Sequence, residues 1–292
     1  MLIDAKLVEK LIKNQFPDWC NLPIKPMEKG GNDNRMFHLG KDMLVRLPSA
    51  KEYASQPEKE FEWLPKLGKQ ISLPIPMPVA IGRPDVEYPF SWLITRYIQG
   101  ETVTRDRIVN MEKFVSELAY FLNELQSADT KNAPTAGAHN FYRGGNLSVY
   151  DGETSRAIEG LNGEFPSDKL SKIWNIAITS KWERDNVWVH GDVAIDNLLL
   201  NQGELGAVID FGCSAVGDPA CDYVMAWTFF DVASRNTFFE LLDCDKDTID
   251  RARGWALWKA LITYDTALSK HVINEILKEE VNSNHFFTEP AS

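Results

Sequence analysis

The chain has 292 residues, of which 44% are hydrophobic and 25% are charged, and its formal net charge is −11 at pH 7. This composition is typical of a globular protein with a sizeable core, and no segment approaches the roughly 18 apolar residues of a membrane span. The negative charge disfavours nucleic acid as a partner; it suits a cationic small substrate and, equally, plain solubility. We therefore expect a cytoplasmic monomer or dimer that binds neither nucleic acid nor membrane.

The first hundred residues combine helix and strand signals. Residues 2–16 have helical apolar spacing, and residues 55–70 predict a second helix, with Ser55 as its N-cap and Pro57 in its first turn. Alternating or β-branched runs bounded by turn residues predict strands at residues 35–40, 43–48, near Val79 and within 90–101. We expect a small, β-rich N-terminal lobe over residues 1–98.

From about residue 99 the pattern is mainly helical. Amphipathic helices with apolar residues three and four positions apart are expected at residues 111–128, 169–184, 250–265 and 269–281. Apolar and β-branched runs within residues 187–210 predict short strands, and residues 131–146 form one long irregular segment. The predicted fold class is therefore α+β, with a larger helical lobe over residues 99–292.

The stretch VWVHGDVAIDNLLL, residues 187–200, places polar residues between two apolar runs. Asp192 and Asn197 lie five residues apart, and Asp210, in VIDFG, follows Asp192 by eighteen residues. Two short strands joined by a turn would bring Asn197 and Asp210 together, with Asp192 nearby. Carboxylate and amide oxygens are hard donors that suit Mg²⁺, which completes its shell with substrate phosphates. A further carboxylate can accept the proton of an acceptor hydroxyl as phosphate is transferred.

The blocks VHGDVAIDNLLL and GAVIDFGCSAVGDPACDY together resemble the aminoglycoside phosphotransferase family. That family is a branch of the protein-kinase-like two-lobe fold that also holds macrolide, choline and homoserine kinases. The resemblance implies Asp192 as the catalytic base and Asn197 and Asp210 as Mg²⁺ ligands, with Asn197 also part of the catalytic loop. It implies that His190 shapes this loop and that Asp196 is a solvated turn residue.

The resemblance extends to the N-terminal lobe. Arg46 occupies the strand position where the family has a phosphate-binding lysine, and Glu60 matches the helix glutamate that pairs with that residue. A guanidinium binds phosphate as a bidentate fork rather than as a point charge, so we expect activity to survive this change. Further nucleotide contacts are implied for the loop residues Gly30, Gly31, Asn32 and Asn34 and for the connecting residues Thr95, Arg96, Tyr97 and Ile98.

The acceptor site is expected in the helical lobe. Asp231 could meet a substrate ammonium, and Trp255 and Trp258 could form a wall of the pocket, although packing or solvent exposure explains each of them more simply. Asp222 is expected to cap the helix that follows it.

The leading hypothesis is a small-molecule kinase that uses ATP or GTP and Mg²⁺ to phosphorylate a hydroxyl. An aminoglycoside antibiotic is the favoured acceptor, which would make the protein an antibiotic-resistance enzyme. A macrolide or another metabolite alcohol is an alternative, because the shared fold does not fix the acceptor. A non-catalytic nucleotide-binding protein is a second alternative, with Arg46 as its main support. A protein kinase is disfavoured, because the sequence leaves no room for a long activation segment.

Overall fold

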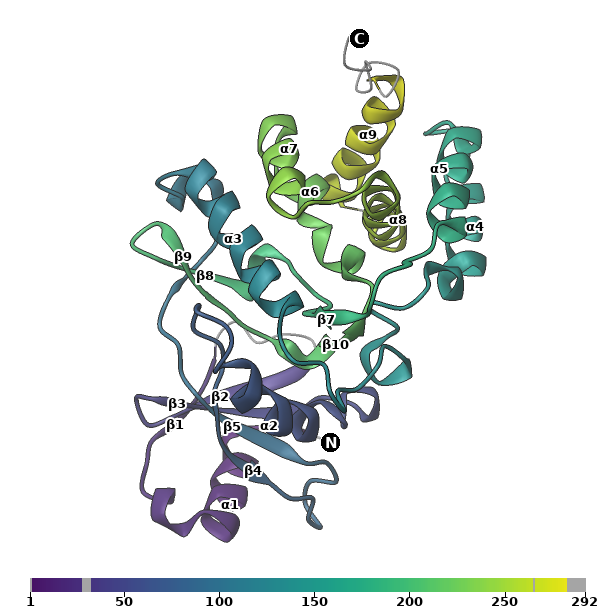
Figure 1. The fold of residues 1–292 in the computed structure, drawn as a ribbon. Helices are drawn as coiled ribbons and strands as arrows, with labels where there is room; N and C mark the ends of the chain where they lie inside the picture. The colour runs from purple at the N-terminus through teal and green to yellow at the C-terminus, as the bar shows by residue number, and fades with distance from the viewer. Residues whose placement is uncertain (1, 28–32, 265, 283–292) are drawn as a thin grey trace.

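The computed structural model describes residues 2–27, 33–264 and 266–282 (Figure 1). Its N-terminal part is built on five antiparallel strands, which are β1 (Ile24–Pro26), β2 (Asn34–Leu39), β3 (Met43–Pro48), β4 (Pro78–Gly82) and β5 (Trp92–Arg96). They pair in the order β1-β2-β3-β5-β4. β4, which begins with Pro78, lies at one edge of the sheet, where a missing backbone donor is tolerated. The strands predicted in this region are therefore confirmed.

Two helices pack against this sheet (Figure 1). The apolar stripe of α1 (Ala5–Gln15) buries Val8, Leu11 and Ile12 in a cluster that includes residues of β2, β3 and β5. The second helix, α2 (Gln56–Leu67), contacts β4 and β5, but its Trp63 and Leu64 belong to the core of the helical part. Thus α2 joins the two parts of the molecule.

The C-terminal part is mainly helical, as predicted. Its helices are α3 (Met111–Gln126), α4 (Asp151–Glu159), α5 (Ser167–Thr179), α6 (Met225–Thr228), α7 (Val232–Leu241), α8 (Lys246–Ile262) and α9 (Ala267–Asn282). α8 packs against α4, α5 and α9, and α3 packs against α7. Within the described ranges, no helix combines the length and the apolarity that crossing a membrane requires.

Two small antiparallel sheets lie between the N-terminal sheet and these helices (Figure 1). β7 (Val187–Val189) pairs with β10 (Ala215–Gly217), and β8 (Leu198–Asn201) pairs with both β6 (Glu101–Thr102) and β9 (Glu204–Val208). The predicted α+β class is confirmed, with an antiparallel sheet in the N-terminal part and helices in the remainder.

The start of α2 differs from the prediction. Ser55 precedes the helix, but its backbone is helical (φ −84°, ψ −13°) and its side chain makes no capping hydrogen bond. A side-chain cap needs an extended backbone at this position, because only then does the hydroxyl reach the first free N–H groups. Only Ala54, itself helical (φ −62°, ψ −23°), separates the 3₁₀ turn at Lys51–Tyr53 from Ser55, so the chain enters α2 without an extended residue.

Candidate active site

A tight hairpin joins the two halves of the polar pattern. β8 and β9 pair with Leu198 opposite Val208, and the N–H of Ile209 donates to the carbonyl of Asn197 at 2.9 Å. Asn197 therefore lies beside Asp210 despite their separation in the chain. The prediction that two short strands would bring these residues together is confirmed.

The Asn197 side chain also binds the loop that carries Asp192. Its Nδ2 donates to the Asp192 carbonyl at 2.8 Å and to Asp192 Oδ2 at 3.0 Å. Because the nitrogen faces Asp192, the Oδ1 oxygen is left as an acceptor on the other side of the amide. Asp192 is half-buried, whereas Asp196 is exposed in the intervening 3₁₀ turn. The Asn197 amide thus holds the Asp192 carboxylate through its nitrogen and directs its Oδ1 oxygen away from Asp192.

His190 and Gly191 shape the same loop. His190 is fully buried; its Nε2 lies 3.0 Å from the Ile209 carbonyl, and its Nδ1 accepts from the Asp192 N–H at 3.2 Å. These bonds require a neutral ring protonated at Nε2, so both nitrogens are occupied. Gly191 has φ +84°, and an added Cβ would lie 2.4 Å from the Cys213 carbonyl oxygen. Both constraints demand glycine at this position.

The carboxylate of Asp222 anchors the backbone of the same loop. It is 1% exposed, and its two oxygens accept from the backbone N–H groups of His190 and Gly191, each at 2.7 Å. Burial raises the pKa of the Asp222 carboxyl, while the hydrogen bonds from these two N–H groups oppose the rise. The predicted helix cap is wrong, since α6 begins after Val224 and has no side-chain cap. A carboxylate inside an apolar run must find donors, but the sequence does not show which ones.

Arg46 joins the N-terminal sheet to Asp210. Its Nη1 donates to Glu60 Oε2 at 2.5 Å and its Nη2 to Asp210 Oδ1 at 3.0 Å. Arg46 is 6% and Glu60 2% exposed, so the pair is desolvated and strongly coupled. Burial raises the pKa of Glu60, and the Arg46 charge opposes that rise. The expected contact between Arg46 and the helix glutamate is present, and Glu62 instead faces solvent with Lys66.

Asp210 has an unusual backbone and, among the described residues, one carboxylate oxygen without a hydrogen-bond donor. Its φ of +64° and ψ of +70° are left-handed, which is uncommon outside glycine and concentrates at functional sites. The oxygen not bound by Arg46, together with Asn197 Oδ1, offers two hard donors, a set that fits Mg²⁺. The described residues contain no group of three or more His, Cys, Asp or Glu side chains placed to hold a metal. A metal bound here would therefore take the rest of its shell from nucleotide and water.

The glycine-rich loop is placed only in part. Gly30, Gly31 and Asn32 lie outside the described residues. Asn34 is buried, and its Nδ2 donates to Gln56 Oε1 at 3.4 Å. Its amide is thus turned toward α2.

The connection between the two parts keeps one backbone donor available. Thr95 is buried within β5, and the N–H groups of Arg96 and Tyr97 donate to carbonyls of neighbouring segments at 2.8 and 2.9 Å. The N–H of Ile98 has no acceptor among the described residues. Ile98 is therefore the residue of this connection whose N–H can meet a ligand.

Asp231 lies at the beginning of α7. Its side chain is exposed and accepts from the Ser234 N–H at 2.8 Å, which caps the helix. The bonds to Ser234 lower the pKa of the Asp231 carboxyl. The structure gives Asp231 a capping role and records no contact between it and Asp192.

The two tryptophans proposed for the acceptor pocket lie in the core. Trp255 is fully buried and Trp258 is 4% exposed. The Tyr150 ring stacks on Trp258 at 4.2 Å between centroids, and the Arg143 guanidinium lies 4.5 Å from the Trp258 ring centre. With these neighbours in place, the indoles pack α8 and leave little surface for a bound molecule.

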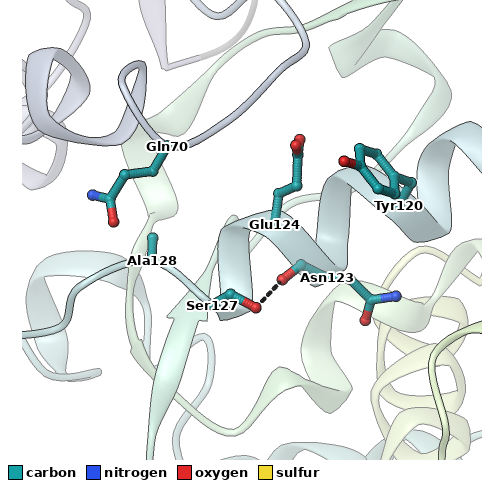
Figure 2. A pocket seen from close by; sticks show the side chains of 6 residues that line it. All are labelled: Gln70, Tyr120, Asn123, Glu124, Ser127 and Ala128. Carbon is teal, nitrogen blue, oxygen red and sulfur yellow. Dashed lines mark hydrogen bonds between the residues drawn. The ribbon is translucent and has the colours of Figure 1, made fainter.

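A hollow of about 470 Å³ lies elsewhere, on the face of α3 toward the end of α2. Its side chains project apart, and the hydrogen bond from Ser127 to the Asn123 carbonyl is internal to α3 (Figure 2). The lining residues are Gln70, Tyr120, Asn123, Glu124, Ser127 and Ala128. None of the predicted site residues is among them, so this hollow is separate from the residues around Asp192 and Asp210.

Comparison with known proteins finds phosphotransferases. Among curated relatives, the aminoglycoside 3'-phosphotransferase of Escherichia coli is 28% identical over 148 residues, which is 47% of this chain and 52% of the relative. The chain thus spans about half the length of the curated relatives it matches.

Solved structures share the fold over almost the whole chain. The GDP complex of wild-type aminoglycoside 2'-phosphotransferase-IIIa aligns with a TM-score of 0.71 at 19% identity, covering 96% of this chain and 100% of the other. Macrolide 2'-phosphotransferase type I aligns with a TM-score of 0.60 at 15% identity, covering 95% and 98%. The predicted kinase-like two-lobe fold is confirmed. The profile of the phosphotransferase enzyme family matches residues 24–255, and the chain belongs to that family.

Proposed function

We propose that the protein transfers the γ-phosphoryl group of ATP or GTP to a hydroxyl of a small molecule, with an aminoglycoside as the leading acceptor. The observation that carries this proposal is the position of Asn197, whose side-chain amide binds Asp192 and whose backbone carbonyl accepts from the N–H of Ile209, next to Asp210. One residue thus links a carboxylate suited to a hydroxyl with a carboxylate suited to a metal. Family membership supports the same reaction class.

In the proposed reaction, the acceptor oxygen forms a bond to the γ-phosphorus while the bond from that phosphorus to the β–γ bridging oxygen breaks. Asp192 orients the hydroxyl and takes its proton, and the nucleoside diphosphate leaves. Mg²⁺, held by Asn197 and Asp210, would neutralise charge on the phosphates when bound. Arg46, braced by Glu60, would place a fixed guanidinium against the same phosphates. Positioning and charge neutralisation then supply most of the rate enhancement.

The nucleobase would meet the connection between the two parts. Ile98 supplies the free N–H, and Thr95, Arg96 and Tyr97 set the position of its backbone. The family resemblance assigns Gly30, Gly31, Asn32 and Asn34 to the phosphates. Among the solved relatives, one complex holds GDP and another holds ATP with streptomycin. Both ATP and GTP are therefore tested as phosphate donors.

A macrolide or another alcohol is the second candidate acceptor, since a macrolide phosphotransferase has the same fold. The formal charge of −11 favours a cationic acceptor. A nucleotide-binding protein without transferase activity is disfavoured, because Asp192, Asn197 and Asp210 are all present, Asn197 binds Asp192, and the Asn197 backbone pairs with Ile209 next to Asp210.

The test is a screen for nucleoside diphosphate release with Mg²⁺ and either ATP or GTP. The acceptors are kanamycin, gentamicin, streptomycin, a macrolide and simple amino alcohols, each checked for a phosphorylated product by mass spectrometry. Asp192→Asn should keep nucleotide binding and reduce transfer by about 10²–10⁴-fold. Transfer near the wild-type rate in this variant would remove Asp192 as the base. Absence of nucleotide binding by the wild type would overturn the proposal as a whole.

A further inference from the structure

Lys59 lies beside Glu60 on α2 and points to the turn that follows Asp210. Its Nζ donates to the Gly212 carbonyl at 2.8 Å and to the Ser214 carbonyl at 2.9 Å. A third contact, at 3.4 Å, joins it to His139 Nδ1. The ammonium therefore connects α2 with two other segments of the chain.

The partners of Lys59 are unusual for a shielded ammonium. A buried charge normally pairs with an opposite charge, but the nearest recorded partners of Lys59 are neutral carbonyl oxygens and a ring nitrogen. Burial lowers the pKa of Lys59 to about 8, although Cys213, Glu60 and Asp210 favour its charged form. Bonds from a charged donor are stronger than those between neutral groups. Lys59 therefore holds the turn after Asp210 firmly, although its ammonium loses hydration in doing so.

The bound carbonyls belong to the turn that sets the direction of Asp210. The 3₁₀ turn Phe211–Cys213 begins directly after Asp210, whose backbone is left-handed. One helical turn before Lys59, the Gln56 side chain packs against Gly212 so closely that an added Cβ would lie 2.7 Å from it. Two residues on one face of α2 thus hold this turn, while Glu60 holds Arg46.

The irregular segment 131–146 completes the arrangement. His139 Nε2 lies 2.9 Å from the Thr135 carbonyl, which fixes the ring that faces Lys59. The neighbouring Asn140 is fully buried, and its Nδ2 donates to the Cys213 carbonyl at 3.1 Å. The turn after Asp210 is therefore clamped between α2 and this segment, and Lys59 contacts both sides.

We infer that Lys59 is a positioning residue that fixes Asp210 for metal binding by tying the following turn to α2. Because Glu60 on the same helix holds Arg46, a single element would set the phosphate-binding cation and the metal-binding carboxylate relative to each other. The inference rests on the proposed function for its consequence in metal binding, but the clamp itself is a property of the unliganded chain.

The experiment uses Lys59→Met, which keeps the length of the side chain and removes its donors. Lys66→Met is the matched control, because Lys66 is on the same helix but is exposed and pairs with Glu62. Hydrogen exchange of the peptide covering residues 209–216 is measured without ligand. Calorimetry then gives the affinity for ADP and for GDP with and without Mg²⁺.

We expect faster exchange at residues 209–216 in Lys59→Met only. Its nucleotide affinity without Mg²⁺ should be unchanged, while the gain in affinity on adding Mg²⁺ should fall about tenfold, the lower limit for losing a residue that orients a metal ligand. Lys59→Arg, which can still donate to two carbonyls, should recover part of both effects.

Unchanged exchange in Lys59→Met would overturn the inference, whatever the protein binds. Altered exchange with an unchanged Mg²⁺ effect would reduce Lys59 to a structural residue and would also overturn it. If Lys59→Met does not fold, the smaller change Lys59→Gln is measured in the same way. If the wild type binds no nucleotide, the proposed function fails, and exchange alone decides whether the clamp exists.

Discussion

The loop around Asp192 and the residues considered for the acceptor differ in how they are held. In the loop, polar groups bind groups distant in sequence: Asp222 binds the backbone of His190 and Gly191, and Asn197 lies beside Asp210. The acceptor candidates have local or packing roles. Asp231 caps its own helix and the tryptophans fill the core.

This difference distinguishes the residues proposed for phosphate transfer from the residues proposed for acceptor binding. The side proposed for phosphate transfer is fixed by buried charges whose partners cannot be removed without a loss of stability, so it tolerates little change. The acceptor side has no such set of fixed charges among the residues considered. Substitutions should therefore damage the two sides to different extents, and the following predictions test that contrast.

The largest effect is expected for Arg46→Met, which leaves Glu60 buried without its cation. Removing one partner of a buried ion pair costs about 3–5 kcal/mol, and urea unfolding at neutral pH should show a loss of this size together with weaker nucleotide binding. Arg46→Lys should recover much of the stability, because it keeps the charge but not the fork. If adding Glu60→Gln to Arg46→Met restores no stability, the ion pair is not what fixes this side.

The second-largest effect is expected for Asp222→Ala. It leaves the backbone N–H groups of His190 and Gly191 without acceptors, and each unpaired buried group costs about 1–3 kcal/mol. We expect a loss of roughly 2–4 kcal/mol in the free energy of unfolding and faster hydrogen exchange at both amides. Asp222→Asn, which keeps one oxygen acceptor, should lose less. Equal exchange in all three proteins would contradict the support assigned to this carboxylate.

The pH dependence of stability should contain a contribution from Lys59. Its pKa falls from 10.5 in the unfolded chain to about 8 in the folded protein. Between these values the unfolded chain binds more protons, so the contribution of Lys59 to the free energy of unfolding rises with pH and is lowest below about pH 8. The full rise is on the order of 3 kcal/mol. Urea unfolding of wild type and Lys59→Met at about pH 7.5 and about pH 9.5 should show wild type gaining relative to the variant; a constant difference would exclude a buried ammonium.

The smallest effect is expected for Asp231→Ala. Loss of the helix cap should cost about 0.5–2 kcal/mol, with kcat/KM for any acceptor unchanged. Asp231→Ser, which can still cap, should be close to wild type in stability. A large rise in KM for a cationic acceptor, with stability retained, would place Asp231 in the acceptor site and would erase the contrast between the two sides.

The features predicted correctly from sequence were those with a local signature. The strands and long helices follow from periodicity, and the juxtaposition of Asn197 and Asp210 follows from a short hairpin. The partners of Asp222 and Lys59 could not be predicted, because they depend on which distant backbone groups the fold brings into reach. Ser55 shows the same limit at short range, since the preceding 3₁₀ turn overrides its capping preference.

The packing of α2 has a consequence for the order in which the newly made chain can fold. Trp63 packs against Trp188, with 5.2 Å between ring centroids, and Leu64 and Leu67 share the same core. During synthesis, α2 therefore leaves the ribosome long before Trp188 is made. The N-terminal sheet can assemble first around its own cluster with α1, and α2 can already contact β4 and β5, but the apolar face of α2 that carries Trp63 lacks this partner until residue 188 has emerged. A fragment ending at residue 98 would keep that face exposed permanently and should aggregate when expressed alone.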